Sequence, residues 1–248
     1  PLVIVADGEI GRVPFPALRD PRTGRDLVES HTLSSASGLA DAARREPAAE
    51  WSALRALLVA DPRFDPGEHP TLNALSGARA EMEALRGVYP DADTLSGSNA
   101  SIDALRAGAR EADVIHYAGH AVFDDTRPER SFLVLAGAER LPADTISRWD
   151  LGGVRLVVLS ACSTIRARHG RSGGFAGLSG AFLSAGAGGV VGSLWKVNDR
   201  LAQPLMEAFH REYRASGDPA AALRKAQLEM RRQGLSPAVW AGFRYVGG

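Results

Sequence analysis

The sequence predicts an α/β fold with a mostly parallel central sheet and helices on both of its faces. Two runs, residues 113–121 (DVIHYAGHA) and 154–164 (VRLVVLSACST), are largely apolar and rich in β-branched residues, as strands buried on both faces are. Strand-like and helix-like segments also alternate from residue 54 onward, which is typical of a parallel sheet.

The composition indicates a globular chain without a bias toward charged partners. At 248 residues with 45% hydrophobic content, it can form one large domain or two small ones. The 29 basic and 29 acidic side chains cancel, so no net field draws the domain to nucleic acid or to an anionic membrane surface. A single cysteine excludes an internal disulfide and a cysteine-cluster metal site, which favours a reduced, cytoplasmic setting. No stretch approaches the roughly 20 apolar residues of a membrane span.

The first fifty residues are expected to form an accessory hairpin region, and residues 51–248 the core of the fold. Residues 2–5 and 13–15 flank Asp7 and Gly8, a turn pair that is typical of a β-hairpin. Residues 27–35 alternate between apolar and polar side chains, as an exposed edge strand does. Residues 36–51 are rich in Ala and Glu and are expected to be helical or weakly ordered.

In the core, strand patterns and helix patterns follow one another. Strands are expected at residues 54–60, 94–95, 113–121, 131–136, 154–159, 189–195 and 240–246. Helices are expected at residues 75–88, 102–109, 141–149, 175–187, 199–213 and 219–233. Ser98 or Asn99 is expected to cap the second of these helices, and Asn198 or Asp199 the fifth.

Small and polar residues follow the two long strands, at the end where open α/β sheets bind their ligands. One strand leads to Cys162 and the other to His120. A thiol with a pKa near 8.5 is mostly protonated at pH 7, so a nucleophilic Cys162 needs a neighbouring base, for which His120 is the candidate. Alternatively, Cys162 is a small buried hydrophobic residue, as many free cysteines are.

His116 also has two interpretations. It shares strand parity with His120, so the two imidazoles could face the same way and bind a metal. The glutamate of an HExxH motif is missing, however, and the surrounding residues favour a strand. A hydrogen-bonded core histidine is the favoured interpretation, and no metal or cofactor is expected.

Segments spread over nearly the whole chain resemble the CHAT domain, a caspase-like cysteine peptidase family in the clan of caspases, metacaspases, clostripain-type enzymes and separase. They are LVIVADGEIGRVPFPALRD, ALLVADP, VIHYAGHA, SFLVLA, LVVLSACST, GLSGAFLSAGAGGVVGSLWKVND and WAGFRYVG. Their order and the spacing from histidine to cysteine carry the resemblance. It implies a caspase-like fold for residues 1–248 as a single domain, the C-terminal part of a longer protein.

The resemblance implies a catalytic dyad of His120 and Cys162. Cys162 would attack the scissile carbonyl and His120 would protonate the leaving amine, while backbone N–H groups of Cys162 and Ala121 hold the oxyanion. Relatives usually have Gly where this chain has Ala121, and an alanine with a positive φ would be strained.

The resemblance also implies a pocket for a basic substrate side chain. Asp199 matches an acidic position that receives such a side chain in separase-like relatives, Asp61 is a second acidic wall, and Ser160 contacts the substrate backbone. Cleavage after Arg or Lys is therefore expected, through pairing of carboxylate and guanidinium. In the alternative interpretation, Asp199 only caps the helix that begins there.

The implied function is that of a regulated bacterial cysteine endopeptidase, a hydrolase that cleaves specific partner proteins or peptides in signalling, defence or cell-death-like responses. A TPR-like regulatory domain or another activator is expected elsewhere in the full-length chain. The alternative is a catalytically silent CHAT-like module that binds proteins through the same cleft. A metal-dependent hydrolase using His116 and His120 is a third hypothesis.

Overall fold

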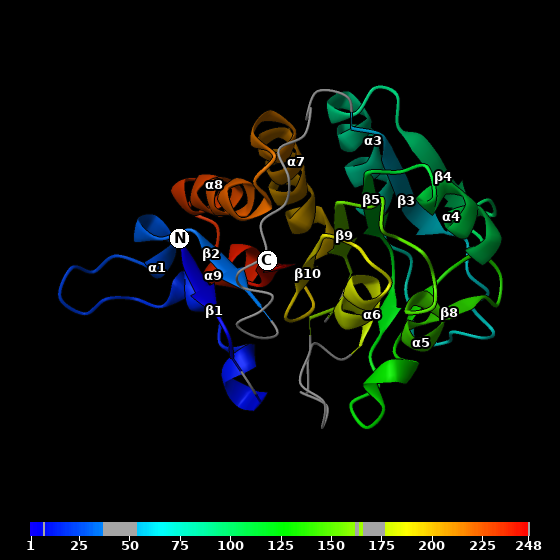
Figure 1. Cartoon of the computed structure of the whole chain (residues 1–248), viewed down its shortest axis with the longest axis horizontal. Helices are drawn as coiled ribbons and strands as arrows, with labels where there is room; N and C mark the ends of the chain where they lie inside the picture. Colours follow the sequence, from blue (N-terminus) through cyan, green and yellow to red (C-terminus); the bar gives the residue numbers. More distant parts are fainter. Residues whose placement is uncertain (7, 37–53, 162–163, 166–176, 248) are drawn as a thin grey trace.

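A computed structural model describes residues 1–6, 8–36, 54–161, 164–165 and 177–247, and its centre is an eight-stranded sheet (Figure 1). In spatial order the strands are β1 (Leu2–Ile4), β2 (Leu33–Ser35), β11 (Phe243–Gly247), β10 (Gly189–Ser193), β9 (Leu156–Ser160), β5 (Val114–Ala118), β3 (Ala56–Pro62) and β4 (Asp93–Gly97). All neighbours are parallel except β10 and β11. The predicted mostly parallel sheet is confirmed.

A second, three-stranded antiparallel sheet follows β5 in the sequence. Its strands are β6 (Ala121–Val122), β7 (Phe132–Val134) and β8 (Arg140–Pro142). The chain therefore leaves the large sheet at the end of β5 and enters the small one two residues beyond Gly119, so His120 lies at the junction between the two sheets.

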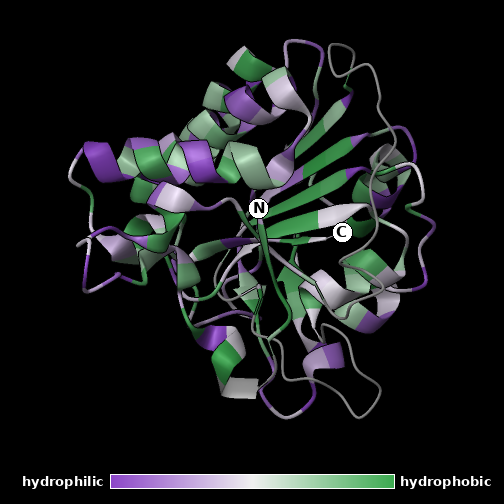
Figure 2. Cartoon of the chain, turned by 60° about the vertical axis from the view of Figure 1, so that its left-hand side comes forward, coloured by the Kyte–Doolittle hydropathy of each residue, from purple (hydrophilic) through white to green (hydrophobic). Residues whose placement is uncertain are grey.

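Helices cover both faces of the large sheet, as predicted, and alternate strand residues supply the two cores. On one face, Val157 and Leu159 pack with α4 (Ile102–Ala109), α5 (Ala143–Ile146) and α6 (Leu178–Ser184). On the other face, Leu156 and Val158 pack with α3 (Ala78–Val88), α7 (Asp199–Ser216), α8 (Pro219–Arg232) and α9 (Pro237–Trp240). Figure 2 shows the strands as hydrophobic between helices of mixed polarity. A strand with two buried faces has no solvent side, which explains the largely apolar runs in the sequence.

The predicted N-terminal hairpin is wrong. Strand β1 pairs with β2 in parallel, with Leu2 opposite Leu33 and Ile4 opposite Ser35. Residues 13–15, which were expected to return as a strand, instead lead from one short 3₁₀ helix, Gly8–Arg12, into a second, Phe15–Ala17. Pro14 and Pro16 lack the backbone N–H that a hairpin ladder requires, which is the physical reason for the difference.

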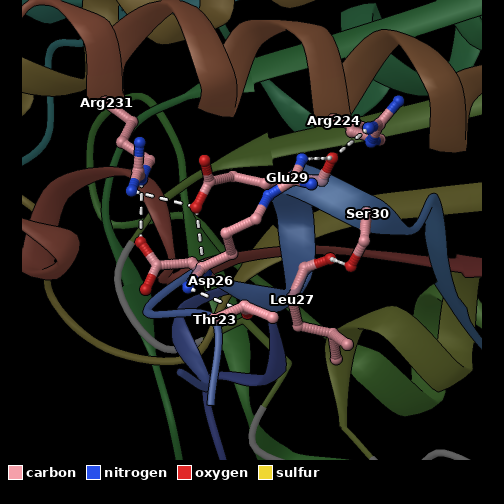
Figure 3. A network of polar contacts seen from close by, with 8 residues as sticks. Thr23, Asp26, Leu27, Glu29, Ser30, Arg224 and Arg231 are labelled. Atoms are coloured by element: carbon pink, nitrogen blue, oxygen red, sulfur yellow. Dashed lines mark hydrogen bonds and ion pairs between the residues drawn. The ribbon is translucent and has the colours of Figure 1, made fainter. Parts of the chain in front are cut away.

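The predicted edge strand over residues 27–35 is partly a helix, α1 (Leu27–Ser30), which precedes β2. A capping box starts it: the Glu29 carboxylate accepts a hydrogen bond from the Asp26 backbone N–H at 2.7 Å. Figure 3 shows how α8 holds this turn, since Arg231 lies 2.7 Å from Asp26 Oδ2 and 3.0 Å from Glu29 Oε2. Arg224 donates to the carbonyl oxygens of Val28 and Glu29, both at 2.8 Å. The division between residues 50 and 51 falls within residues 37–53, outside the described residues, and stays a prediction.

Smaller differences concern where elements end. The helix of residues 102–109 is capped by Ser101, whose Oγ accepts from the Ala104 N–H at 3.2 Å, and not by Ser98 or Asn99. Residues 141–149 were expected to be one helix, but Leu141 belongs to β8 and α5 is a single turn. In the part of the chain that is described, no helix is long and apolar enough to span a membrane.

Candidate active site

His120 is held by its backbone at the junction between the two sheets. Its carbonyl oxygen accepts the N–H of Val134 at 2.9 Å and the hydroxyl of buried Tyr117 at 2.9 Å, while the same hydroxyl lies 2.6 Å from the Val134 carbonyl oxygen. A Cβ at position 119 would lie 2.4 Å from that hydroxyl, so only glycine permits this close approach. Tyr117 and Gly119 thus fix the backbone from which the His120 imidazole projects.

The His120 imidazole has a defined tautomer when it is neutral. Its Nε2 lies 2.7 Å from the carbonyl oxygen of Asn73, which can only accept, so Nε2 carries the proton and Nδ1 keeps the lone pair. The ring of Phe64 packs edge-on at 5.3 Å between centroids. Burial lowers the pKa of the imidazole, and the Asn73 carbonyl opposes this shift more weakly. The ring is therefore neutral at pH 7, and its Nδ1 lone pair is available to accept a proton.

Cys162 and Ser163 lie outside the described residues, but the segments on both sides of them are described. Ser193, at the end of β10, contacts both sides: its Oγ donates to the Ala161 carbonyl at 2.6 Å, and its carbonyl accepts the Ile165 N–H at 3.0 Å. Its own N–H donates to Thr164 Oγ1 at 2.9 Å. A Cβ at position 192 would lie 2.4 Å from that Oγ1, so glycine lets this segment approach β10. Three hydrogen bonds from one buried serine therefore anchor the chain on either side of the cysteine.

The register of β5 and β9 brings the two predicted dyad positions to corresponding places. Ala118 lies opposite Ser160 on these neighbouring parallel strands. His120 follows Ala118 by two residues, and Cys162 follows Ser160 by two residues. The sheet thus directs both chain segments toward one edge, where the carboxyl ends of parallel strands meet.

Ala121 does not have the conformation that would strain an alanine. Among the described residues, Asp61 is the only one other than glycine with a positive φ, at 49°. Ala121 begins β6 opposite Leu133. The expectation of strain at Ala121 is therefore not met, although its role in binding an oxyanion stays a prediction.

A pocket opens beside this edge, between the starts of α3 and α7. It brings together two of the three predicted substrate-binding residues, Ser160 and Asp199. The lining residues are Leu75, Ala78, Glu81, Ala118, Gly119, Ser160, Ala161, Ser193, Val197, Asp199, Ala202 and Phe243.

Asp199 begins α7 and its carboxylate reaches α3. Its Oδ2 accepts the Gly77 N–H at 2.6 Å, and its Oδ1 accepts the Arg200 N–H at 3.0 Å. Asn198 is the N-cap, because its side chain accepts from Arg200 N. Asp199 thus links two helix starts as well as lining the pocket.

Asp61, the third predicted substrate-binding residue, is not among the lining residues. It lies at a bulge in β3, and its Oδ2 is 3.3 Å from Nη2 of Arg79 on α3. The structure therefore does not bring Asp61 together with Ser160 and Asp199.

The sequence analysis missed a buried polar chain next to the pocket. Glu81 Oε1 lies 2.9 Å from His116 Nε2, His116 Nδ1 lies 3.0 Å from His210 Nε2, and the Tyr89 hydroxyl lies 3.1 Å from His210 Nδ1. All four side chains are buried. Burial also lowers the pKa of His210 well below its usual value. The signal in the sequence was a Glu and a His inside the apolar stripes of α3 and α7.

His116 and His120 contact different groups. His116 faces Glu81 and His210 inside the core, whereas the His120 Nε2 contacts the Asn73 carbonyl oxygen. The predicted hydrogen-bonded core position of His116 is confirmed. Within the described ranges, no group of three or more His, Cys, Asp or Glu side chains is arranged to hold a metal ion.

The chain belongs to the CHAT domain family, whose model matches residues 1–248. No sequence among the curated proteins matches it significantly. Solved structures with similar folds include a gingipain and a separase. One is RgpB from Porphyromonas gingivalis, solved as a complex of its pro- and mature domains. It is 10% identical to this chain with a TM-score of 0.55, and the match covers 80% of this chain and 48% of that one. A related structure is described as the Arg-specific cysteine proteinase gingipain R.

Separase from Saccharomyces cerevisiae, solved with securin, is 13% identical with a TM-score of 0.62, and the match covers 99% of this chain and 15% of that one. The chain thus spans less than half of the gingipain chain and a small part of the separase chain. At these identities the likeness shows the fold, which is that of the caspase-like cysteine peptidases.

Proposed function

We propose that this domain is a cysteine endopeptidase in which Cys162 is the nucleophile and His120 the general acid and base. The observation that carries the proposal is the His120 side chain itself. Its Nε2–H is engaged by the Asn73 carbonyl, its Nδ1 is left as the base, and it follows a strand that is in register with the strand leading to Cys162. The caspase-like fold and the single cysteine of the chain support the same assignment.

The reaction would proceed in two steps. The Cys162 thiol gives its proton to His120 Nδ1, and the thiolate sulfur attacks the scissile carbonyl carbon. The C–N bond breaks as His120 returns the proton to the leaving amine, which gives a thioester. Water, deprotonated by His120, then cleaves the thioester to release the carboxylic acid and the thiol. Backbone N–H groups of Ala121 and Cys162 would bind the oxyanion.

We further propose that the substrate is a protein cleaved after Arg or Lys, with Asp199 and Ser160 in the pocket that receives this side chain. The carboxylate of Asp199 and the absence of Lys and Arg among the lining residues of the described pocket support a cationic ligand. Asp61 is a weaker candidate for this role, since Arg79 already occupies its carboxylate.

The wider setting rests on the family resemblance alone. We propose a bacterial, cytoplasmic enzyme of signalling or defence that is controlled by a regulatory domain, such as TPR repeats, or by another activator. This regulation would limit cleavage to a few partner proteins, and the activity of the isolated domain is one of the outcomes of the experiment below.

The experiment is cleavage of fluorogenic peptides that vary only in the P1 residue, by the wild-type chain and by Cys162→Ala and His120→Ala. Cleavage after Arg or Lys that is lost in both variants is the expected result. Cleavage that survives in Cys162→Ala contradicts the nucleophile, and cleavage after Leu, Met or Asp without a basic preference contradicts the pocket assignment. Absence of cleavage with the full-length protein and its activator would favour the protein-binding alternative.

A further inference from the structure

The pocket contains a second carboxylate besides Asp199, and the two differ in their partners. The Asp199 carboxylate accepts two backbone N–H groups, from Gly77 and Arg200. Glu81 also lines the pocket but is only 2% exposed. Its Oε1 lies 2.9 Å from His116 Nε2, yet the two groups are not aligned as a hydrogen bond. Glu81 is therefore a buried carboxylate with an oxygen that lacks a well-formed hydrogen bond.

The position of Glu81 makes it the deeper of the two carboxylates. It lies in the first turn of α3, three residues after Ala78, so both side chains share the helix face that lines the pocket. Asp199 is half-buried, whereas Glu81 is almost inaccessible. On its far side, His116, His210 and Tyr89 form a continuous buried chain. The core thus closes behind Glu81, and the pocket is on its other side.

The rest of the lining favours a positively charged ligand. Small residues surround the carboxylates, namely Ala78, Ala118, Gly119, Ala161 and Ala202, and the described residues that line the pocket include no Lys or Arg. A buried carboxylate is costly unless it is paired and hydrogen-bonded. A guanidinium presents several donors in a planar fork, and an ammonium presents three donors, so either group could pair with the Glu81 carboxylate from the pocket side.

We propose that Glu81 is a specificity-determining residue that receives the guanidinium or ammonium end of a basic substrate side chain at the floor of this pocket. The proposal deepens the proposed function and rests on it, since it assigns the pocket to the P1 residue. His116 is a positioning residue in this arrangement, because its Nε2 contacts Glu81 from the core side. Asp199 binds the same side chain nearer the mouth of the pocket.

Ligand binding tests the proposal without catalysis. Calorimetry with the full chain measures the affinity for N-butylguanidine, for n-pentylamine and for n-pentanol as the uncharged comparison. Both cations are expected to bind and the alcohol is not. Glu81→Gln should weaken cation binding about 10- to 100-fold, the loss expected when a charge-assisted contact becomes a neutral one. The matched control is Glu83→Gln on the exposed face of the same helix, where Glu83 pairs with Arg86, and it should leave the affinity unchanged.

The outcomes are separable from those of the peptidase assay. Equal cation affinity in Glu81→Gln and the wild-type chain overturns the proposal, as does a wild-type chain that binds neither cation. Cys162→Ala should abolish cleavage and keep cation binding, so failure of the dyad and failure of the pocket are distinct results. If Glu81→Gln does not fold, a structure of the wild-type chain with N-butylguanidine decides: a guanidinium within hydrogen-bond distance of Glu81 supports the proposal, and one that contacts Asp199 alone overturns it.

Discussion

Replacing Thr164 by Val should loosen the segment that carries Cys162. Thr164 is 2% exposed, and its Oγ1 accepts the Ser193 N–H at 2.9 Å. Valine keeps the shape of threonine and removes the acceptor, so this hydrogen bond is lost.

The expected loss of stability follows from the Thr164 hydroxyl and methyl groups, which are removed one at a time. A hydrogen bond of this kind contributes about 1 kcal/mol to stability. Thr164→Ser is the matched control, because it keeps the hydroxyl and removes only a methyl group, at a cost of about 1 kcal/mol. The two variants therefore lose comparable stability, and the difference between them is expected in the reactivity of the cysteine.

The assay is the rate of alkylation by iodoacetamide as a function of pH. Cys162 is the only thiol in the sequence, so the rate reports on it alone. A thiol with a pKa near 8.5 is only about 3% ionised at pH 7, whereas one with a pKa near 7 is about half ionised. If the anchored segment holds Cys162 beside His120, Thr164→Val should react up to about tenfold more slowly at pH 7, and His120→Ala sets the largest loss.

Thr164→Ser should react like the wild-type chain. The reasoning is refuted if Thr164→Val has the wild-type alkylation rate and pH midpoint while its stability falls as expected. In that case the hydrogen bonds of Ser193 would serve stability alone.

Three further predictions concern stability and local order. His210 has a lowered pKa in the folded chain, so as pH falls below about 6.5 only the unfolded chain gains this proton. The free energy of unfolding should therefore drop by up to about 1.4 kcal/mol per pH unit. Urea titrations at several pH values should show a weaker pH dependence of this free energy in His210→Gln. Tyr117→Phe removes the donor to two carbonyls near His120 and should lower the unfolding free energy by about 1–3 kcal/mol, so an unchanged urea midpoint would contradict that role. Arg231→Ala should lower the local stability of residues 27–35 by about 1 kcal/mol, so that their amides exchange hydrogen faster. The control is Arg211→Ala, which removes an exposed pair with Glu229, and equal exchange in both variants would argue that Arg231 does not hold α1 in place.

Much of the sheet could be predicted from the sequence because its central strands are buried on both faces. Strands β5 and β9 required largely apolar runs, and those runs are visible without a structure. The N-terminal hairpin failed because Asp7 and Gly8 gave a local turn signal, whereas β1 pairs in parallel with β2 after an intervening segment. A turn pair reports on neighbours in sequence and contains no information about a partner that lies further along the chain.

In the candidate site, too, features set by adjacent residues could be predicted, whereas contacts with residues far along the chain could not. The position of His120 followed from the strand that precedes it, and Asp199 and Ser160 do line one pocket. The Asn73 carbonyl that fixes the His120 tautomer comes from a loop distant in sequence, and no pattern indicated it. Glu81 could have been noticed, since it lies three residues after Ala78 and four before Leu85, within the apolar stripe of its helix.

The place of β11 in the sheet has a consequence for how the chain folds as it is synthesised. This strand lies between β10 and β2, and it provides the link through which β1 and β2 join the rest of the sheet. Strands β1 and β2 leave the ribosome before the other strands of this sheet, and they wait for residues 243–247 before their edge is covered, while β3, β5 and β9 can pair earlier. Such a distant pairing closes a long loop and is expected to be slow. Until it forms, β2 has an open edge that a chaperone or a second nascent chain can reach.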